Sequence, residues 1–216
     1  MGLVGGVTGS KRFNALIQEI NSENDDFSLI PHGSLMGQVT VPFGITTELN
    51  YFPKITINNI SAKSAALGLK WTFSQYLPVP LVELAVKVHY SKSNVSYGQL
   101  IQNQSTGNQP IASNIIFENK VRGVQLLGSV DLPFVEPFVA VGIVEGRTDF
   151  NIQANGSATI FENSVLLDSS GVASSREKSF HYLAGVQFKL FLLHFSLEYA
   201  GLFGTQKYSG KFSVYF

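Results

Sequence analysis

The chain contains no cysteine, so disulfides and cysteine-based metal sites are excluded. Charged residues make up only 14% of it, against roughly 25% in soluble domains. The formal net charge is zero, so electrostatics give no case for a nucleic-acid partner. No apolar run approaches the roughly 18 residues that a transmembrane helix needs. Any membrane crossing must therefore use strands, which in lipid must close into a barrel.

Apolar residues recur at every second position through most of the chain, which indicates strands with two unlike faces. At the C-terminus, Phe212, Val214 and Phe216 share one face, and the chain ends on an aromatic residue. Alternating lipid-facing and lumen-facing residues with aromatic girdles are typical of outer-membrane β-barrels. We expect the following residues to face lipid: Leu69, Trp71, Val86, Val88, Phe188, Phe195 and Leu197.

Nine stretches with this alternation lie beyond residue 34, and residues 2–9 could supply a tenth. We therefore predict an all-β fold, an antiparallel transmembrane β-barrel of about ten strands. Eight strands are the alternative, since bacterial barrels usually have an even number.

The predicted connections are of two kinds, short turns at one end and two long polar loops over residues 91–112 and 151–176 at the other. Short periplasmic turns and longer external loops are the usual asymmetry of outer-membrane barrels. A soluble lipocalin-like barrel, with its apolar face turned inward, is the alternative that alternation alone allows. The asymmetry and the aromatic C-terminus favour the membrane interpretation.

One segment has a helical period. Four apolar residues lie on one face of a helix expected over residues 11–20: Phe13, Leu16, Ile17 and Ile20. So short a helix is marginal in water, so its stability must come from docking. We expect it to plug or cap one mouth of the barrel, with simple packing against the barrel as the alternative. The expected division is an N-terminal segment, 1–26, and a barrel, 27–216.

The polar faces of the predicted strands carry charges of both signs and could line a path for a solute. The alternative is an internal network of ion pairs, which the balanced signs favour. The candidate lumen residues are Glu48, Lys70, Glu83, Lys87, His89, Gln187, Lys189, His194, Glu198 and Lys211. A turn expected near residues 204 and 205 would place Glu198 directly opposite Lys211.

Three histidines, His89, His181 and His194, are expected to point into the lumen. No metal-ligand spacing and no nucleophile motif accompanies them. We therefore expect no enzymatic activity, no metal and no cofactor.

Short strand-like motifs are spread over most of the chain. They are Ile30-Pro31-His32-Gly33, residues 68–78, Glu83-Leu84-Ala85-Val86, residues 136–143 and residues 184–190. In these motifs the chain resembles an uncharacterised family of bacterial outer-membrane barrels, distantly similar to long-chain fatty-acid transporters. The resemblance implies the fold and the location, offers no catalytic residues, and favours an N-terminal plug.

Two functions are therefore expected. The first is an outer-membrane barrel that binds or passes a small hydrophobic solute or lipid. The alternative is a closed structural or adhesive barrel that acts through its long external loops. Residues 1–6 lack the features of a secretory signal, so we expect a mature exported form in the bacterial outer membrane. The expected partners are outer-membrane lipid and a lipophilic small molecule, and no nucleic acid.

Overall fold

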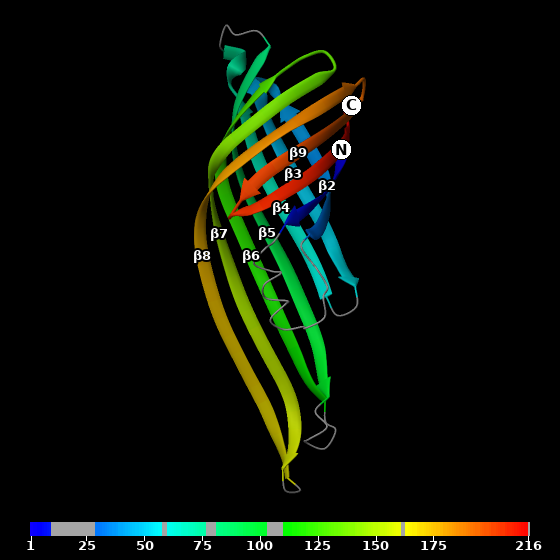
Figure 1. The fold of residues 1–216 in the computed structure, drawn as a ribbon, viewed down its shortest axis with the longest axis vertical. Coiled ribbons are helices and arrows are strands. Elements are labelled where there is room, and N and C mark those ends of the chain that lie inside the picture. The colour runs from blue at the N-terminus through cyan, green and yellow to red at the C-terminus, as the bar shows by residue number, and fades with distance from the viewer. Residues whose placement is uncertain (10–28, 58–59, 77–80, 103–109, 161–162, 216) are drawn as a thin grey trace.

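The computed structural model describes residues 1–9, 29–57, 60–76, 81–102, 110–160 and 163–215. Ten strands form one closed barrel in which every neighbouring pair is antiparallel, and β1 closes the ring against β10 (Figure 1). The strands are β1 (Gly2–Gly9), β2 (Leu29–Val41), β3 (Ile45–Ile57), β4 (Ile60–Thr72), β5 (Val82–Gln102), β6 (Pro110–Val130), β7 (Val135–Ile160), β8 (Asn163–Leu190), β9 (Leu193–Leu202) and β10 (Thr205–Val214). The predicted ten-strand antiparallel barrel is confirmed.

The described residues contain no α-helix, and only the short 3-10 turns η1 (Pro42–Gly44) and η2 (Ser74–Tyr76) interrupt the strand pattern. No helix in this part of the chain is long and apolar enough to cross a membrane. The helix expected over residues 11–20 falls within residues 10–28, outside the described residues.

Strand β1 belongs to the barrel, because it pairs with both β10 and β2. The division at residue 26, which placed this strand in a separate N-terminal segment, is therefore corrected. The sequence signal was weak because glycine interrupts the apolar alternation at Gly2, Gly5, Gly6 and Gly9.

The outer face of the barrel is an apolar belt. Of the seven residues expected to face lipid, six are between 40% and 49% exposed, and Val86 is half-buried. A continuous apolar surface of this kind is unfavourable in water and marks a surface that meets lipid. The side chains that alternate with the belt point into the barrel, so the molecule is a transmembrane barrel with a polar lumen.

The strands differ greatly in length. β1, β9 and β10 have 8 to 10 residues, close to the ~9–11 that cross a bilayer, whereas β7 and β8 have 26 and 28. Strands β5 to β8 therefore continue beyond the belt, at the end opposite the two termini (Figure 1). We call this extension the tall wall.

The prediction of long polar loops over residues 91–112 and 151–176 is wrong, because most of these residues belong to the strands of the tall wall. Strand β5 runs to Gln102 and β6 begins at Pro110, while β7 runs to Ile160 and β8 begins at Asn163. Outside lipid the outer face of a strand need not be apolar. These segments are rich in Ser, Asn and Gln, a composition typical of loops, and yet they form paired strands.

The register of the last hairpin also differs from the prediction. Phe203 and Gly204 form the turn with φ values of 50° and 69°, which is the left-handed geometry of a tight two-residue hairpin. Glu198 consequently lies opposite Ser209, and Lys211 lies opposite Ser196. The two charges share the lumen face but sit diagonally, because the turn is centred earlier than expected.

The turn of the β9–β10 hairpin contacts the inner face of β7 and β8 in the tall wall. The Phe203 amide donates a hydrogen bond to the Ser179 hydroxyl at 3.1 Å. A Cβ added at Gly146 would lie 2.8 Å from the Phe203 ring, so the ring lies directly against that glycine. Residues of β8 and β7 therefore fix the position of the turn.

We predict that an arginine in the belt destabilises the barrel strongly. Val139→Arg should lower the free energy of unfolding in lipid vesicles by about 2–4 kcal/mol, because it places a cation inside the belt, two outward rows from its edge at Ile143. Ser174→Arg is the control, since Ser174 is exposed on β8 beyond the belt. Urea titration followed by tryptophan fluorescence reports both variants. Equal losses in the two would contradict the membrane placement.

Candidate functional site

The barrel encloses a cavity of about 1190 Å³. All ten lumen residues predicted from the sequence lie on its wall. They come from β3, β4, β5, β8, β9 and β10, so the cavity is a property of the closed sheet rather than of any one loop. Their role in a solute path stays a prediction.

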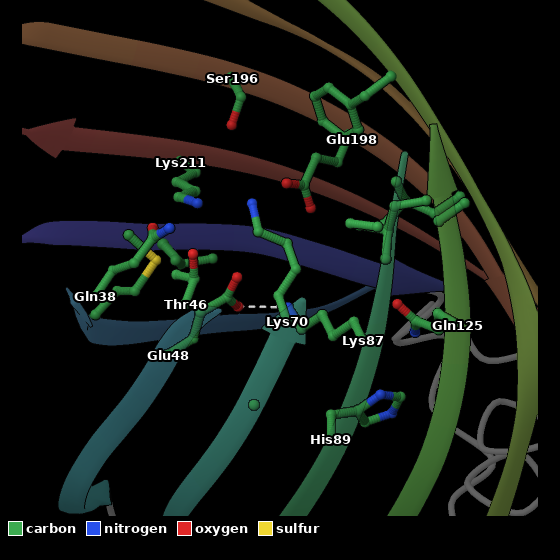
Figure 2. Close-up of a pocket in the computed structure, with 18 of the residues that line it drawn as sticks. Gln38, Thr46, Glu48, Lys70, Lys87, His89, Gln125, Ser196, Glu198 and Lys211 are labelled. Carbon is green, nitrogen blue, oxygen red and sulfur yellow. Dashed lines mark hydrogen bonds and ion pairs between the residues drawn. The ribbon is translucent and has the colours of Figure 1, made fainter. Parts of the chain in front are cut away.

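The first organised contact in the lumen is an ion pair between Lys87 on β5 and Glu48 on β3 (Figure 2). The two side chains are only 22% and 12% exposed. Between their strands lies Gly68, and a Cβ added there would lie 3.1 Å from the Lys87 side chain. The glycine therefore makes room for the lysine to reach across β4.

A second contact also crosses a glycine, but it joins an amide to an imidazole instead of two opposite charges. Gln125 Nε2 and His181 Nδ1 are 2.6 Å apart, and the strand between them carries Gly142. A Cβ added at Gly142 would lie 2.9 Å from Cγ of Gln125. In both cases a glycine on the middle strand lets two polar side chains meet over it.

A third group of polar contacts lies at the end of the lumen near the termini. Lys189 pairs with Asp131 and with Glu136, the latter at 2.8 Å. Gln187 donates a hydrogen bond to Glu136 at 3.4 Å and contacts Nδ1 of His194 at 3.3 Å. This end of the lumen is an interlinked ion-pair network, as the alternative interpretation of the lumen charges expected.

The middle of the lumen is different. Figure 2 shows Lys70, Glu198 and Lys211 pointing into one space from β4, β9 and β10. Among the described residues, no carboxylate lies within ion-pair distance of Lys70 or Lys211. Lys70 instead lies directly opposite Lys87 in the sheet.

The charges that face this space are unequal. Lys211 faces Glu48 and Glu198 but also Lys70 and Lys87, and Lys207 faces Glu198. Four lysines thus share two glutamates, which leaves an excess of two positive charges. We call these six side chains the central cluster.

Part of the wall beside the central cluster is apolar. One row across four strands contains Ala85, Leu127, Ala140 and Leu183, each opposite the next in the sheet. All four line the cavity. Sequence reasoning missed this row because β5 to β8 carry apolar residues on both faces here, as in Val139, Ala140 and Val141, so alternation disappears.

Glu83 and His89 are the remaining candidates on the cavity wall. Glu83 lies on the cavity wall opposite Ser129, and His89 lies over Gly123. In the described ranges, no three His, Asp or Glu side chains gather closely enough to hold a metal ion. The Ser196 hydroxyl is buried without a hydrogen-bond partner among these residues.

We predict that Glu48 and Lys87 are energetically coupled. A double-mutant cycle with Glu48→Gln and Lys87→Met should give a coupling of roughly 1–3 kcal/mol, because each charge is partly buried and depends on the other. The control cycle combines Glu48→Gln with Lys70→Met, two residues that form no ion pair. A coupling no larger than in the control would show that the Glu48–Lys87 contact contributes nothing to stability.

Several solved outer-membrane barrels are similar to this chain at low sequence identity. The translocator domain of the autotransporter NalP from Neisseria meningitidis is 11% identical, with coverage of 99% of this chain and 85% of that chain and a TM-score of 0.46. Ail, the attachment invasion locus protein of Yersinia pestis, is 11% identical over 98% and 93% of the two chains, with a TM-score of 0.32. The β domain of the Bordetella autotransporter BrkA is 12% identical over 100% and 98%, with a TM-score of 0.37.

These TM-scores are all below 0.5, so the assignment as a membrane barrel rests on the apolar belt and the polar lumen of this chain. No curated protein matches the sequence. A family model does match, over residues 5–210, and covers nearly all of the barrel. The chain therefore belongs to the family of unknown function DUF6588.

Proposed function

We propose that this protein is an outer-membrane barrel whose lumen binds or passes a small amphiphilic anion, such as a short carboxylic acid. The apolar belt supports the membrane placement, and the tall wall at one end supports an outer-membrane orientation with that wall outside. The observation that carries the solute class is the central cluster, in which Lys70 and Lys211 face the cavity without an ion pair to any described residue.

The charge excess favours an anion for an electrostatic reason. A lysine in a narrow lumen loses part of its hydration, and the loss is offset only by a nearby negative charge. Lys87 has Glu48 as its partner, but in the part of the chain that the structure describes no carboxylate lies within ion-pair distance of Lys70 or Lys211. A carboxylate in the cavity would supply the missing charge-assisted hydrogen bonds.

The apolar row of the cavity wall supports the apolar part of the proposed amphiphilic ligand. Ala85, Leu127, Ala140 and Leu183 give the cavity an apolar strip next to the cationic space. A cavity of about 1190 Å³ is above the ~300–1,000 Å³ of ordinary ligand pockets, so a small solute leaves room for water. The lipophilic solute expected from the sequence is thereby narrowed to one that carries an anionic group.

We expect the reconstituted full chain to conduct chloride in planar bilayers with a preference for anions. Lys70→Gln combined with Lys211→Gln should lower the anion-to-cation permeability ratio by about threefold or more, because it removes two lumen charges. Reversal potentials in a potassium chloride gradient measure this ratio. Added hexanoate should reduce the chloride current of the unmodified protein and have little effect on the double variant.

The matched control is Lys54→Gln, which removes an exposed lysine of β3 that does not line the cavity. It should leave both selectivity and hexanoate block unchanged. A current that prefers cations, or one that hexanoate affects equally in all variants, would reject the anion assignment. No current, together with no hexanoate bound to the purified protein, would favour the closed structural or adhesive barrel.

A further inference from the structure

The outer face of the tall wall changes abruptly from apolar to charged. The last wholly apolar row of the belt on β5 to β8 consists of Val88, Val124, Ile143 and Phe180, each opposite the next. These side chains are 46% to 62% exposed. The next outward-facing row holds Tyr90, Arg122, Glu145 and Lys178. The change therefore takes place within one step of the pleat.

The row after that consists entirely of cations. Lys92 lies opposite Lys120, Lys120 opposite Arg147, and Arg147 opposite Arg176. Like charges directly opposite each other destabilise a sheet. Four of them in line across four strands therefore need compensating negative charge on both sides.

Three carboxylates supply part of this compensation. Glu118 pairs with Lys120 at 2.6 Å and with Lys92 at 2.9 Å. Asp149 pairs with Arg147 at 2.9 Å, and Glu145 pairs with Arg122 at 3.1 Å and with Arg176 at 3.4 Å. Hydrogen bonds from Lys120 and Lys92 lower the pKa of Glu118 to about 2, so its pairs stay charged in any physiological medium.

The compensation is incomplete. The outward cations of these rows and of the adjoining β4 are Lys63, Lys92, Lys120, Arg122, Arg147, Arg176 and Lys178. Seven cations against three carboxylates leave four excess positive charges. Glu177 alternates with Arg176 and Lys178 along β8 and is therefore not counted among the residues of this face. We call this surface the cationic face.

The lower edge of the cationic face lies at the height of the headgroup layer of a bilayer. Successive outward rows are two residues apart, or ~6.6 Å along the strand, and less in height because strands tilt by ~35–45°. The all-cation row is two rows beyond the apolar belt and so stands roughly 10 Å above it. Polar headgroups occupy roughly the first 5–8 Å outside the hydrocarbon core. The row that contains Arg122 therefore lies within that layer, and the all-cation row lies just beyond it, within reach of long arginine and lysine side chains.

We propose that the cationic face binds the phosphate groups of lipids in the outer leaflet. The arginines are the best-placed ligands, since the side chains of Arg122, Arg147 and Arg176 are 68%, 50% and 61% exposed even with their carboxylate partners. A guanidinium binds phosphate oxygens in a bidentate manner. Tyr90, at the boundary row, is placed where barrel aromatics meet the interface. The inference rests on the proposed outer-membrane placement and not on solute passage.

Native mass spectrometry of the full chain in neutral micelles provides the test. The probes are phosphatidic acid, which has a phosphate monoester headgroup, and phosphatidylcholine, which has no net charge. The unmodified barrel should retain phosphatidic acid in preference. The triple variant Arg122→Gln, Arg147→Gln, Arg176→Gln should bind it about tenfold more weakly, with phosphatidylcholine unchanged.

Two further variants make the result specific. The triple Arg→Lys change at the same positions keeps the charge but loses the bidentate geometry, and it should fall between the unmodified protein and the glutamine variant. Lys189→Gln, in the lumen at the end of the barrel near the termini, should bind like the unmodified protein. Retention of the heat-dependent mobility of a folded barrel in gels shows that each variant is folded.

Four outcomes would overturn the proposal. The glutamine variant could keep its phosphatidic acid, or Lys189→Gln could lose as much lipid as the glutamine variant does. Inorganic phosphate could compete as effectively as the lipid, which would assign the face to a soluble anion. The glutamine variant could also lose binding of soluble polyphosphate while its lipid binding stays intact. That result would assign the cationic face to a polyanionic polymer instead. Failure of chloride conductance would affect the proposed lumen function and leave this result unchanged.

Discussion

Backbone hydrogen bonding is the constraint on which the rest of this structure depends. Within lipid, each strand N–H and C=O must find a partner in the protein, and only a sheet without edges provides that everywhere. The pairing of β1 with β10 removes the last two edges. Once the ring is closed, the pleat assigns each residue to one of two solvents. The belt and the polar lumen are two results of that single alternation.

Glycine is the residue that turns this regular cylinder into a structured interior. Gly68 and Gly142 each leave a gap on the middle of three strands, and a polar contact forms over the gap. Side chains two strands apart could not otherwise approach, because the side chain between them would intervene. The lumen contacts are therefore specified as much by missing side chains as by the charges that meet.

The sequence predicted the strand number, the pairing direction and the two faces of most strands, because all three follow from a local period of two. It failed where position depends on something non-local. The register of Glu198 and Lys211 depends on the turn at Phe203 and Gly204, and a shift in that turn changes every pair in the hairpin. The apolar row of the lumen and the cation row outside it combine residues from several strands. Lys92 and Arg176, for example, share a row although 84 positions separate them in the sequence.

The seam between β1 and β10 also has a consequence for how the barrel assembles. All other pairs join strands that are neighbours along the chain, so each closes a much shorter loop than the seam does. The seam alone joins the two ends of the polypeptide, through seven residue pairs of which three involve Gly2, Gly5 and Gly6 of β1. We therefore expect the seam to be the last pairing to form, while the longest ladder joins β7 and β8. We expect a folding intermediate of this protein to be an open sheet that has grown outward from the β7–β8 hairpin. In that intermediate the glycine-rich strand β1 has not yet paired with β10.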